Sequence, residues 1–204
     1  MNSQNSHLLA SLIGSRICHD LISPVGAIQN GIELLSLEGA VRGPEMMLIS
    51  DSVSSASAKI RFLRIAFGLA GHGQQIGPKE VCSILDDLSQ SGRITYDWTP
   101  QEGSFDRSDI QEVFLAMLCL ESAMPQGGAI SVTRPDDNPK GWEVSGPAKT
   151  DRPDSFLWET VKTGEGAETV MPAHVQFALL PAVVAERFGQ ITLTETEHGL
   201  TISF

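Results

Sequence analysis

The sequence predicts an α+β protein in two parts, a helical hairpin followed by an α/β sandwich. Apolar residues recur at helical spacing through the first third of the chain, which favours long amphipathic helices. The rest alternates short helix-like and strand-like segments. Between the two parts, residues 71–78 hold three glycines and a proline, a composition typical of a linker. We therefore predict one domain over residues 1–73 and a second over residues 78–204.

Composition supports this division and narrows the function. Residues 1–76 hold five acids and five bases, so the whole formal charge of -11 lies in residues 77–204. Such an acidic chain is a poor partner for nucleic acid or for an anionic membrane. No segment approaches the ~20 apolar residues of a membrane span. The three separated cysteines (Cys18, Cys82 and Cys119) fit reduced thiols, so we expect a cytoplasmic protein.

The hairpin is predicted from two apolar stripes and a turn. The first stripe runs at helical spacing from Leu9 to Leu35, and the chain turns at residues 38–44, where Pro44 suits the first position of a helix. The second stripe follows steps of three and four, the spacing of a coiled-coil seam. This predicted seam consists of Ile49, Val53, Ala56, Ile60, Leu63 and Phe67.

Two helices alone cannot bury both stripes. Pairing two hairpins into a dimeric four-helix bundle would cover them, and this predicts a homodimer. Packing of the hairpin against the chain's own second domain is the alternative.

The second part is predicted to form one mixed sheet covered by helices on one face. Ser108 is expected to cap the longest helix there, with Gln111 completing a capping box. Pro181 is expected to kink or restart the last helix. The expected helices are 79–90, 108–124 and 172–188, and the expected strands are 93–98, 129–134, 141–145, 191–195 and 200–204.

A candidate reactive group is His19 in the first helix. It lies two residues from both Ile17 and Leu21, so its side chain should point away from the buried stripe. The other residues on its face are small or polar, namely Ser23, Gly26 and Asn30, and they leave room for another protein to approach the ring. A neutral imidazole, with a pKa near ~6.5, offers a nucleophilic nitrogen at pH 7. The alternative is a solvent-facing histidine without a role.

Several neighbours could assist this imidazole. Asp20 could hold the tautomer of the ring or take its proton. Three arginines could offset the charge of a phosphate: Arg16 in the same helix, and Arg61 or Arg64 in the next. The other histidines and the cysteines show no metal-ligand spacing, so no metal site is predicted.

Two segments together resemble a known family. CHDLISPVGAIQNGIELL, followed by KIRFLRIAFG, is similar to the ChpT-like histidine phosphotransferases of alphaproteobacteria, which are degenerate relatives of sensor histidine kinases. The resemblance implies that His19 accepts a phosphoryl group from the receiver domain of a hybrid histidine kinase. The group would then pass to a CtrA-like response regulator, with Ile22 on the docking face. Mg²⁺ would belong to the receiver domain, not to this chain.

The resemblance also implies that the second part is a degenerate ATP-binding domain. Ser122 stands where kinases carry a Mg-coordinating asparagine, and residues 144–148 lack the aspartate of the adenine box. Val175 and Phe177 fall where a Gly-x-Gly loop would make room for phosphates. We therefore expect no ATP binding and no autokinase activity. An ATP-dependent sensor kinase core and a non-catalytic dimeric adaptor for receiver domains are the alternatives.

Overall fold

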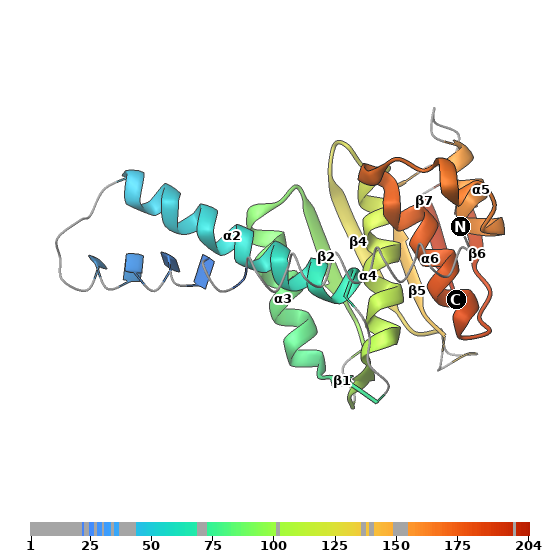
Figure 1. Ribbon diagram of the computed structural model, residues 1–204, viewed down its shortest axis with the longest axis horizontal. Helices are drawn as coiled ribbons and strands as arrows, with labels where there is room; N and C mark the ends of the chain where they lie inside the picture. Colours follow the sequence, from blue (N-terminus) through green and yellow to red (C-terminus); the bar gives the residue numbers. More distant parts are fainter. Residues whose placement is uncertain are drawn as a thin grey trace.

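The computed structural model shows a mixed α+β protein with a helical extension at one end and a sheet-containing body at the other (Figure 1). In the extension, the described residues between 22 and 36 are helical, and α2 (Pro44–Ala66) follows them. The structure describes residues 22, 25–26, 28–29, 31–33, 35–36, 44–68, 73–100, 103–135, 138, 141–148, 155–197 and 199–204.

The body is built on a five-stranded sheet in the order β2-β4-β5-β7-β6. Only β2 and β4 run parallel, and the other neighbours are antiparallel, so the predicted mixed sheet and the terminal hairpin are confirmed. In β4, the buried residues Ile130 and Val132 alternate with partly exposed ones, so one face of the sheet is covered. The strands are β2 (Ile94–Trp98), β4 (Gly128–Thr133), β5 (Glu143–Gly146), β6 (Thr192–Thr196) and β7 (Gly199–Ser203).

The central helix of the body is α4, in which ten of sixteen residues are buried. It contacts α2 on one side and α6 on another, while α5 packs on α6. The helices of the body are α3 (Pro78–Ser91), α4 (Arg107–Ser122), α5 (Ser155–Thr163) and α6 (Val175–Glu186), with single 3-10 turns at η1 (Ala167–Thr169) and η2 (Pro172–His174). None of the helices in the described part of the chain combines the length and apolarity needed to cross a bilayer.

The predicted capping of α4 is wrong. The helix begins at Arg107, because the preceding residues form β3 (Phe105–Asp106), which pairs with β1 (Gln75–Ile76) and keeps the chain extended up to that point. The amide of Arg107 donates to the carbonyl of Gln74 at 2.9 Å. Ser108 therefore lies inside the helix. Gln111 is buried and donates to the carbonyls of Ala66 and Gly68, at 3.2 and 2.9 Å.

The last helix and α5 also differ from expectation. The stretch predicted as one helix over 172–188 divides into η2 and α6, and Pro181 lies inside α6 without ending it. No helix was expected at α5. Its nine residues bury Leu157, Trp158 and Val161, a stripe too short to stand out as a periodic pattern.

Along α2, two apolar faces have different surroundings. Phe62, Ile65 and Ala66 belong to the core of the body, and the ring of Phe62 stacks on Phe114 with centroids 4.2 Å apart. The alternative of packing on the chain's own second domain thus holds for this face. The predicted seam lies on another face, where Ile49 is 47% exposed. Its last two residues, Leu63 and Phe67, are partly buried against the core of the body.

Candidate functional site

Half of the residues proposed for the reactive site lie within the described part of the chain. Ile22, Gly26, Arg61 and Arg64 are described. Arg16, His19, Asp20 and Ser23 lie outside the described residues. The structure therefore describes four of the proposed supporting residues, on the first helix and on α2, and not the imidazole itself.

The first helix presents an open surface at Gly26. Ile22 and Gly26, one turn apart, are helical and half-buried. A Cβ placed on Gly26 would meet no heavy atom of the described residues within 4 Å, so this position has room for a side chain. The same holds for Gly31, which lies outside the predicted face of His19, so this space does not distinguish one face of the helix from another.

Arg61 connects α2 to the body. Its guanidinium forms an ion pair and hydrogen bond with the carboxylate of Asp87 on α3, and the two side chains are 34% and 45% exposed. Beside this pair lies a polar cleft of about 600 Å³ that reaches from α3 to Gln29 on the first helix and includes serines of α2. Arg61 is thus held on the α3 side of α2.

Arg64 lies where the end of α2 meets the start of α4. Its carbonyl accepts a hydrogen bond from Nη2 of Arg107 at 2.9 Å, while its own Nε is buried without a partner. Burial lowers the pKa of Arg107, and the charge of Arg64 lowers it further, against the opposing effect of Glu80. Two guanidinium groups therefore share this junction.

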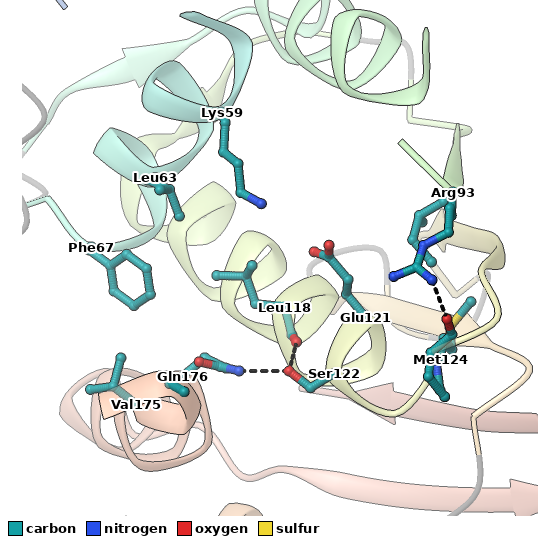
Figure 2. Close-up of a pocket in the computed structure, with 13 residues that line it drawn as sticks. Lys59, Leu63, Phe67, Arg93, Leu118, Glu121, Ser122, Met124, Val175 and Gln176 are labelled. Atoms are coloured by element: carbon teal, nitrogen blue, oxygen red, sulfur yellow. Dashed lines mark hydrogen bonds between the residues drawn. The ribbon is translucent and has the colours of Figure 1, made fainter. Parts of the chain in front are cut away.

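A groove of about 440 Å³ separates α2 from the end of α4 and the start of α6 (Figure 2). We call it the junction groove. Lys59 from α2 and Arg93 from the start of β2 supply its cations, with Glu121 between them. Apolar side chains, including Leu63 and Phe67 of the predicted seam, form part of its wall.

The far wall of the junction groove is closed by a hydrogen bond between α4 and α6. The Ser122 hydroxyl donates to the carbonyl of Leu118 at 2.9 Å and accepts from Nε2 of Gln176 at 2.8 Å (Figure 2). Next along the chain, Phe177 is 2% exposed and packs edge-to-face on Trp158, with ring centroids 5.1 Å apart. Two of the positions matched to nucleotide boxes, Ser122 and Phe177, are therefore occupied in contacts within the body.

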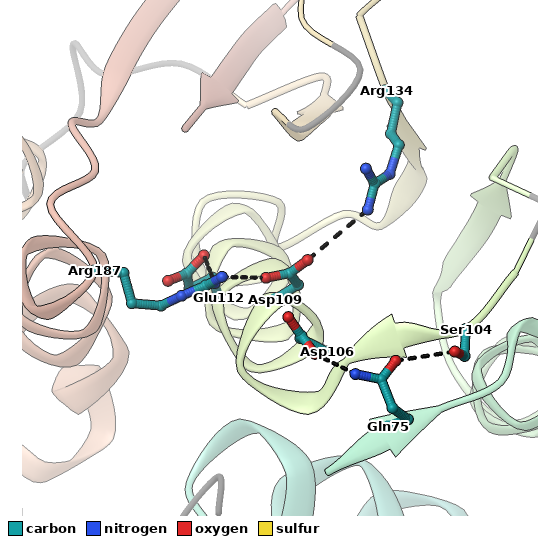
Figure 3. A network of polar contacts seen from close by, with 7 residues as sticks. All are labelled: Gln75, Ser104, Asp106, Asp109, Glu112, Arg134 and Arg187. Atoms are coloured by element: carbon teal, nitrogen blue, oxygen red, sulfur yellow. Dashed lines mark hydrogen bonds and ion pairs between the residues drawn. The ribbon is translucent and has the colours of Figure 1, made fainter. Parts of the chain in front are cut away.

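A network of ion pairs that was not predicted joins the other ends of α4 and α6 (Figure 3). Arg187 donates to Asp109 at 2.6 Å and to Glu112 at 3.0 Å, and Arg134 lies 3.8 Å from Asp109. Burial raises the pKa of Glu112 to about 7, although Arg187 acts to lower it. The sign in the sequence was a pair of carboxylates, Asp109 and Glu112, three residues apart at the start of a mainly apolar helix. Nearby, Asp106 and Ser104 bind the Gln75 side chain.

Within the described residues, no group of three or more His, Cys, Asp or Glu side chains lies close enough together to hold a metal ion. Cys119 is buried and Cys82 is half-buried. Burial raises the pKa of both thiols, so neither is predisposed to bind metal or to react as a thiolate.

Comparison with known proteins decides the family. A model of the family described as "Histidine phosphotransferase C-terminal domain" matches residues 78–199. The curated "Protein phosphotransferase ChpT" of Brucella abortus (strain 2308) is 31% identical over 199 residues, which are 96% of this chain and 94% of that protein. The chain belongs to the ChpT family of histidine phosphotransferases.

A solved structure agrees with this assignment. The chain described as "1.7 Angstrom Structure of a Bacterial Phosphotransferase" superposes with a TM-score of 0.62 at 27% identity. The match covers 93% of this chain and 91% of that one. Membership of the ChpT family thus extends over the hairpin and the body together, and the family model begins at the first residue of α3.

Proposed function

We propose that this ChpT-family protein relays a phosphoryl group in a two-component phosphorelay. His19 accepts the group from the aspartate of a receiver domain in a hybrid histidine kinase. It then passes the group to the aspartate of a CtrA-like response regulator. The observation that carries the proposal is the 31% identity to a phosphotransferase along nearly the whole chain.

The chemistry requires little more than positioning. A ring nitrogen of His19 attacks phosphorus in line, an N–P bond forms, and the O–P bond to the receiver carboxylate breaks. The second transfer reverses these steps on another receiver. Asp20 holds the ring tautomer, and Arg16 and Arg64 offset phosphate charge. Arg61 assists less directly because Asp87 already engages its guanidinium. Mg²⁺ belongs to the acidic pocket of the receiver.

Docking of the receiver is supported by the surfaces on both sides of α2. The open helix surface at Gly26 lets a partner approach the backbone of the first helix, with Ile22 as an apolar contact. Lys59 on α2 and Arg93 on the acidic body place two cations in the junction groove. We propose that this groove forms a wall of the receiver site, since a receiver carries its phosphorylated aspartate among other carboxylates.

Homodimerisation through the hairpin is supported by the apolar side chains left exposed there. Ile28, Leu35 and Ile49, which all belong to the predicted stripes, are 53%, 42% and 47% exposed. Burying such side chains contributes up to about 1.5–3 kcal/mol each, against an association cost of roughly 4–15 kcal/mol. A bundle that buries both stripes of two chains would exceed this cost, as a four-helix bundle does.

We also propose that the body binds no ATP and that the protein has no autokinase activity. The residues matched to the nucleotide boxes do not fit a nucleotide. The Ser122 hydroxyl is engaged by Gln176 and Leu118. Phe177, which was matched to the Gly-x-Gly loop by counting along the sequence, lies in α6, and its ring packs on Trp158. No step of the proposed reaction therefore passes through ATP.

The test is a reconstituted relay from a phosphorylated receiver to an acceptor receiver. We expect the acceptor to gain label only when the chain is present, and His19→Gln to abolish that gain. Ile22→Asp should slow transfer by weakening receiver binding. Binding of both receivers without any transfer would instead favour the non-catalytic adaptor. Micromolar affinity for ATP with self-labelling would favour the sensor kinase core.

A further inference from the structure

One phenylalanine is exposed in a way that the fold itself does not require. Phe188 is 98% exposed and follows Arg187, the C-terminal cap of α6. Its φ of +60° lies in the left-handed region, which favours glycine at this position of a helix end. Backbone hydrogen bonds close the turn, and in one of them the amide of Gly189 donates to the carbonyl of Val184 at 3.0 Å. The ring therefore adds almost nothing to the core while occupying a position suited to glycine.

A groove begins at the neighbouring residue. It has a volume of about 450 Å³, and we call it the α5–α6 groove because it runs between the end of α5, one face of α6 and the start of β6. Small apolar side chains of α6 line it, among them Ala178, Ala182 and Ala185. Gly189 and Ile191 complete the side next to Phe188. An exposed aromatic ring beside an apolar groove is typical of a protein-binding surface.

The charges around the groove select the kind of partner. Lys162 lines the groove and forms an ion pair with Glu159 at 2.8 Å, so these two charges offset each other. Glu165 and Glu186 are also exposed on the elements that border the groove, in a body that carries the whole formal charge of -11. A second copy of this chain would bring the same acidic border to the contact. The negative electrostatic potential around the groove therefore favours a partner segment of positive charge.

This surface lies far from the hairpin. In the sheet, β6 occupies one edge and β2 the other, and α2 packs on α3 and α4. Figure 1 shows α2 at one end of the molecule and α5 and β6 at the other. The junction groove takes Val175 and Gln176 from the start of α6, and the α5–α6 groove takes Ala178 to Ala185 from the rest of the same helix. A partner seated on the α5–α6 groove would leave the hairpin face accessible to a receiver.

We propose that Phe188 and the α5–α6 groove form a second docking surface for a basic segment of a partner protein. An apolar anchor of that segment enters the groove and packs against the ring of Phe188. Its cationic side chains meet the acidic border. The surface is separate from the phosphotransfer site, so the partner and a receiver bind at the same time.

The experiment selects peptides from a random phage-displayed library on the full-length protein. We expect the selected peptides to carry net positive charge and at least one large apolar residue. Phe188→Gly should lower their affinity at least tenfold, and it suits the left-handed backbone, so folding is retained. Ala182→Leu, which fills the groove, should lower the affinity similarly. The matched control is Phe156→Ala, which removes a 49% exposed ring outside the groove and should change the affinity less than twofold.

The outcomes separate this proposal from its competitors. Selection of neutral or acidic peptides, or equal binding to Phe188→Gly, would overturn it. A lower mass in solution for Phe188→Gly would show that a second copy occupies the groove, which also overturns it. The selected peptide should leave the rate of His19 labelling unchanged within twofold, and a block of labelling would contradict separate sites. Absence of labelling without peptide would instead count against the phosphorelay proposal alone.

Discussion

The hairpin and the body differ in how far each can cover its own apolar surface. Four large apolar side chains in the described hairpin residues are more than 40% exposed: Ile28, Leu35, Met47 and Ile49. The described residues of the much longer body include three, namely Phe156, Met171 and Phe188. The body closes one continuous core, which takes in only the last turns of α2. The proposed reactive group therefore lies on the part of the molecule that depends on its surroundings, and the body anchors that part.

The largest effect is expected from removing the contact by which α2 is anchored in the core of the body. Phe62→Ala deletes a ring that is 3% exposed and stacked on Phe114, so it should lower the free energy of unfolding by about 3–5 kcal/mol. Denaturant unfolding measures this change. Phe156→Ala, at a 49% exposed ring, is the control and should change stability by less than about 0.5 kcal/mol. Equal effects of the two substitutions would show that α2 does not share the core of the body.

The next test concerns the uncovered seam. Ile49→Glu places a charge in the predicted contact between two hairpins and should raise the dissociation constant of the dimer at least about 100-fold, or ~2.7 kcal/mol. Sedimentation over a range of concentrations measures this constant. Met47→Glu is the matched control, because Met47 is 68% exposed on the same helix but lies outside the predicted seam. A monomeric wild-type chain, or equal weakening by both variants, would contradict the proposed bundle.

Within the body, the network at Glu112 predicts a dependence of stability on pH. The pKa of Glu112 is raised from 4.5 to about 7, so the folded state binds the proton more tightly than the unfolded state. The tighter binding of this proton stabilises the folded state fully below pH 4.5. As the pH rises through 7 this stabilisation is lost, and the free energy of unfolding falls by on the order of 3 kcal/mol. In Glu112→Gln, whose side chain does not titrate, the free energy of unfolding should change less between pH 4.5 and pH 7 than in the wild type. A slope equal to the wild type would contradict the assignment.

The smallest expected effect is at the link between the two regions. The Arg61–Asp87 pair is partly exposed, so a double-mutant cycle with Arg61→Gln and Asp87→Asn should give a coupling of about 0.2–1 kcal/mol. Both variants break the pair, but only Arg61→Gln removes the cation. If Arg61 helps to offset phosphate charge, Arg61→Gln slows transfer several-fold and Asp87→Asn does not. Equal transfer rates would restrict Arg61 to holding α2 on α3.

Local signals predicted much of the fold. Pro44 marks the first residue of α2, and the β6–β7 hairpin follows the alternation of its strands. The capping box at Ser108 failed because tertiary pairing of β1 with β3 fixes where α4 begins. Contacts between distant residues left even weaker signals. The Ser122–Gln176 bond spans 54 residues, and the ion pair of Arg187 with Glu112 spans 75, so no local pattern could announce them.

The candidate site was predictable in a different way. The face of His19 followed from helical spacing alone and stays a prediction, because His19 lies outside the described residues. The partner of Arg61 could not be foreseen, because Asp87 lies on a helix of the other region. The junction groove was missed for the same reason, since Lys59 and Arg93 come together only when α2 docks on the body.

The central claim is that a single imidazole carries the phosphoryl group, and locating that group tests it most directly. The protein is phosphorylated by a labelled receiver, cleaved at neutral pH, and the modified peptide is identified by mass spectrometry. The account predicts an acid-labile, alkali-stable phosphate on the peptide that contains His19, lost in His19→Gln and retained in His174→Gln. A phosphate that persists in His19→Gln, or that alkali removes as it does an acyl phosphate, would contradict it.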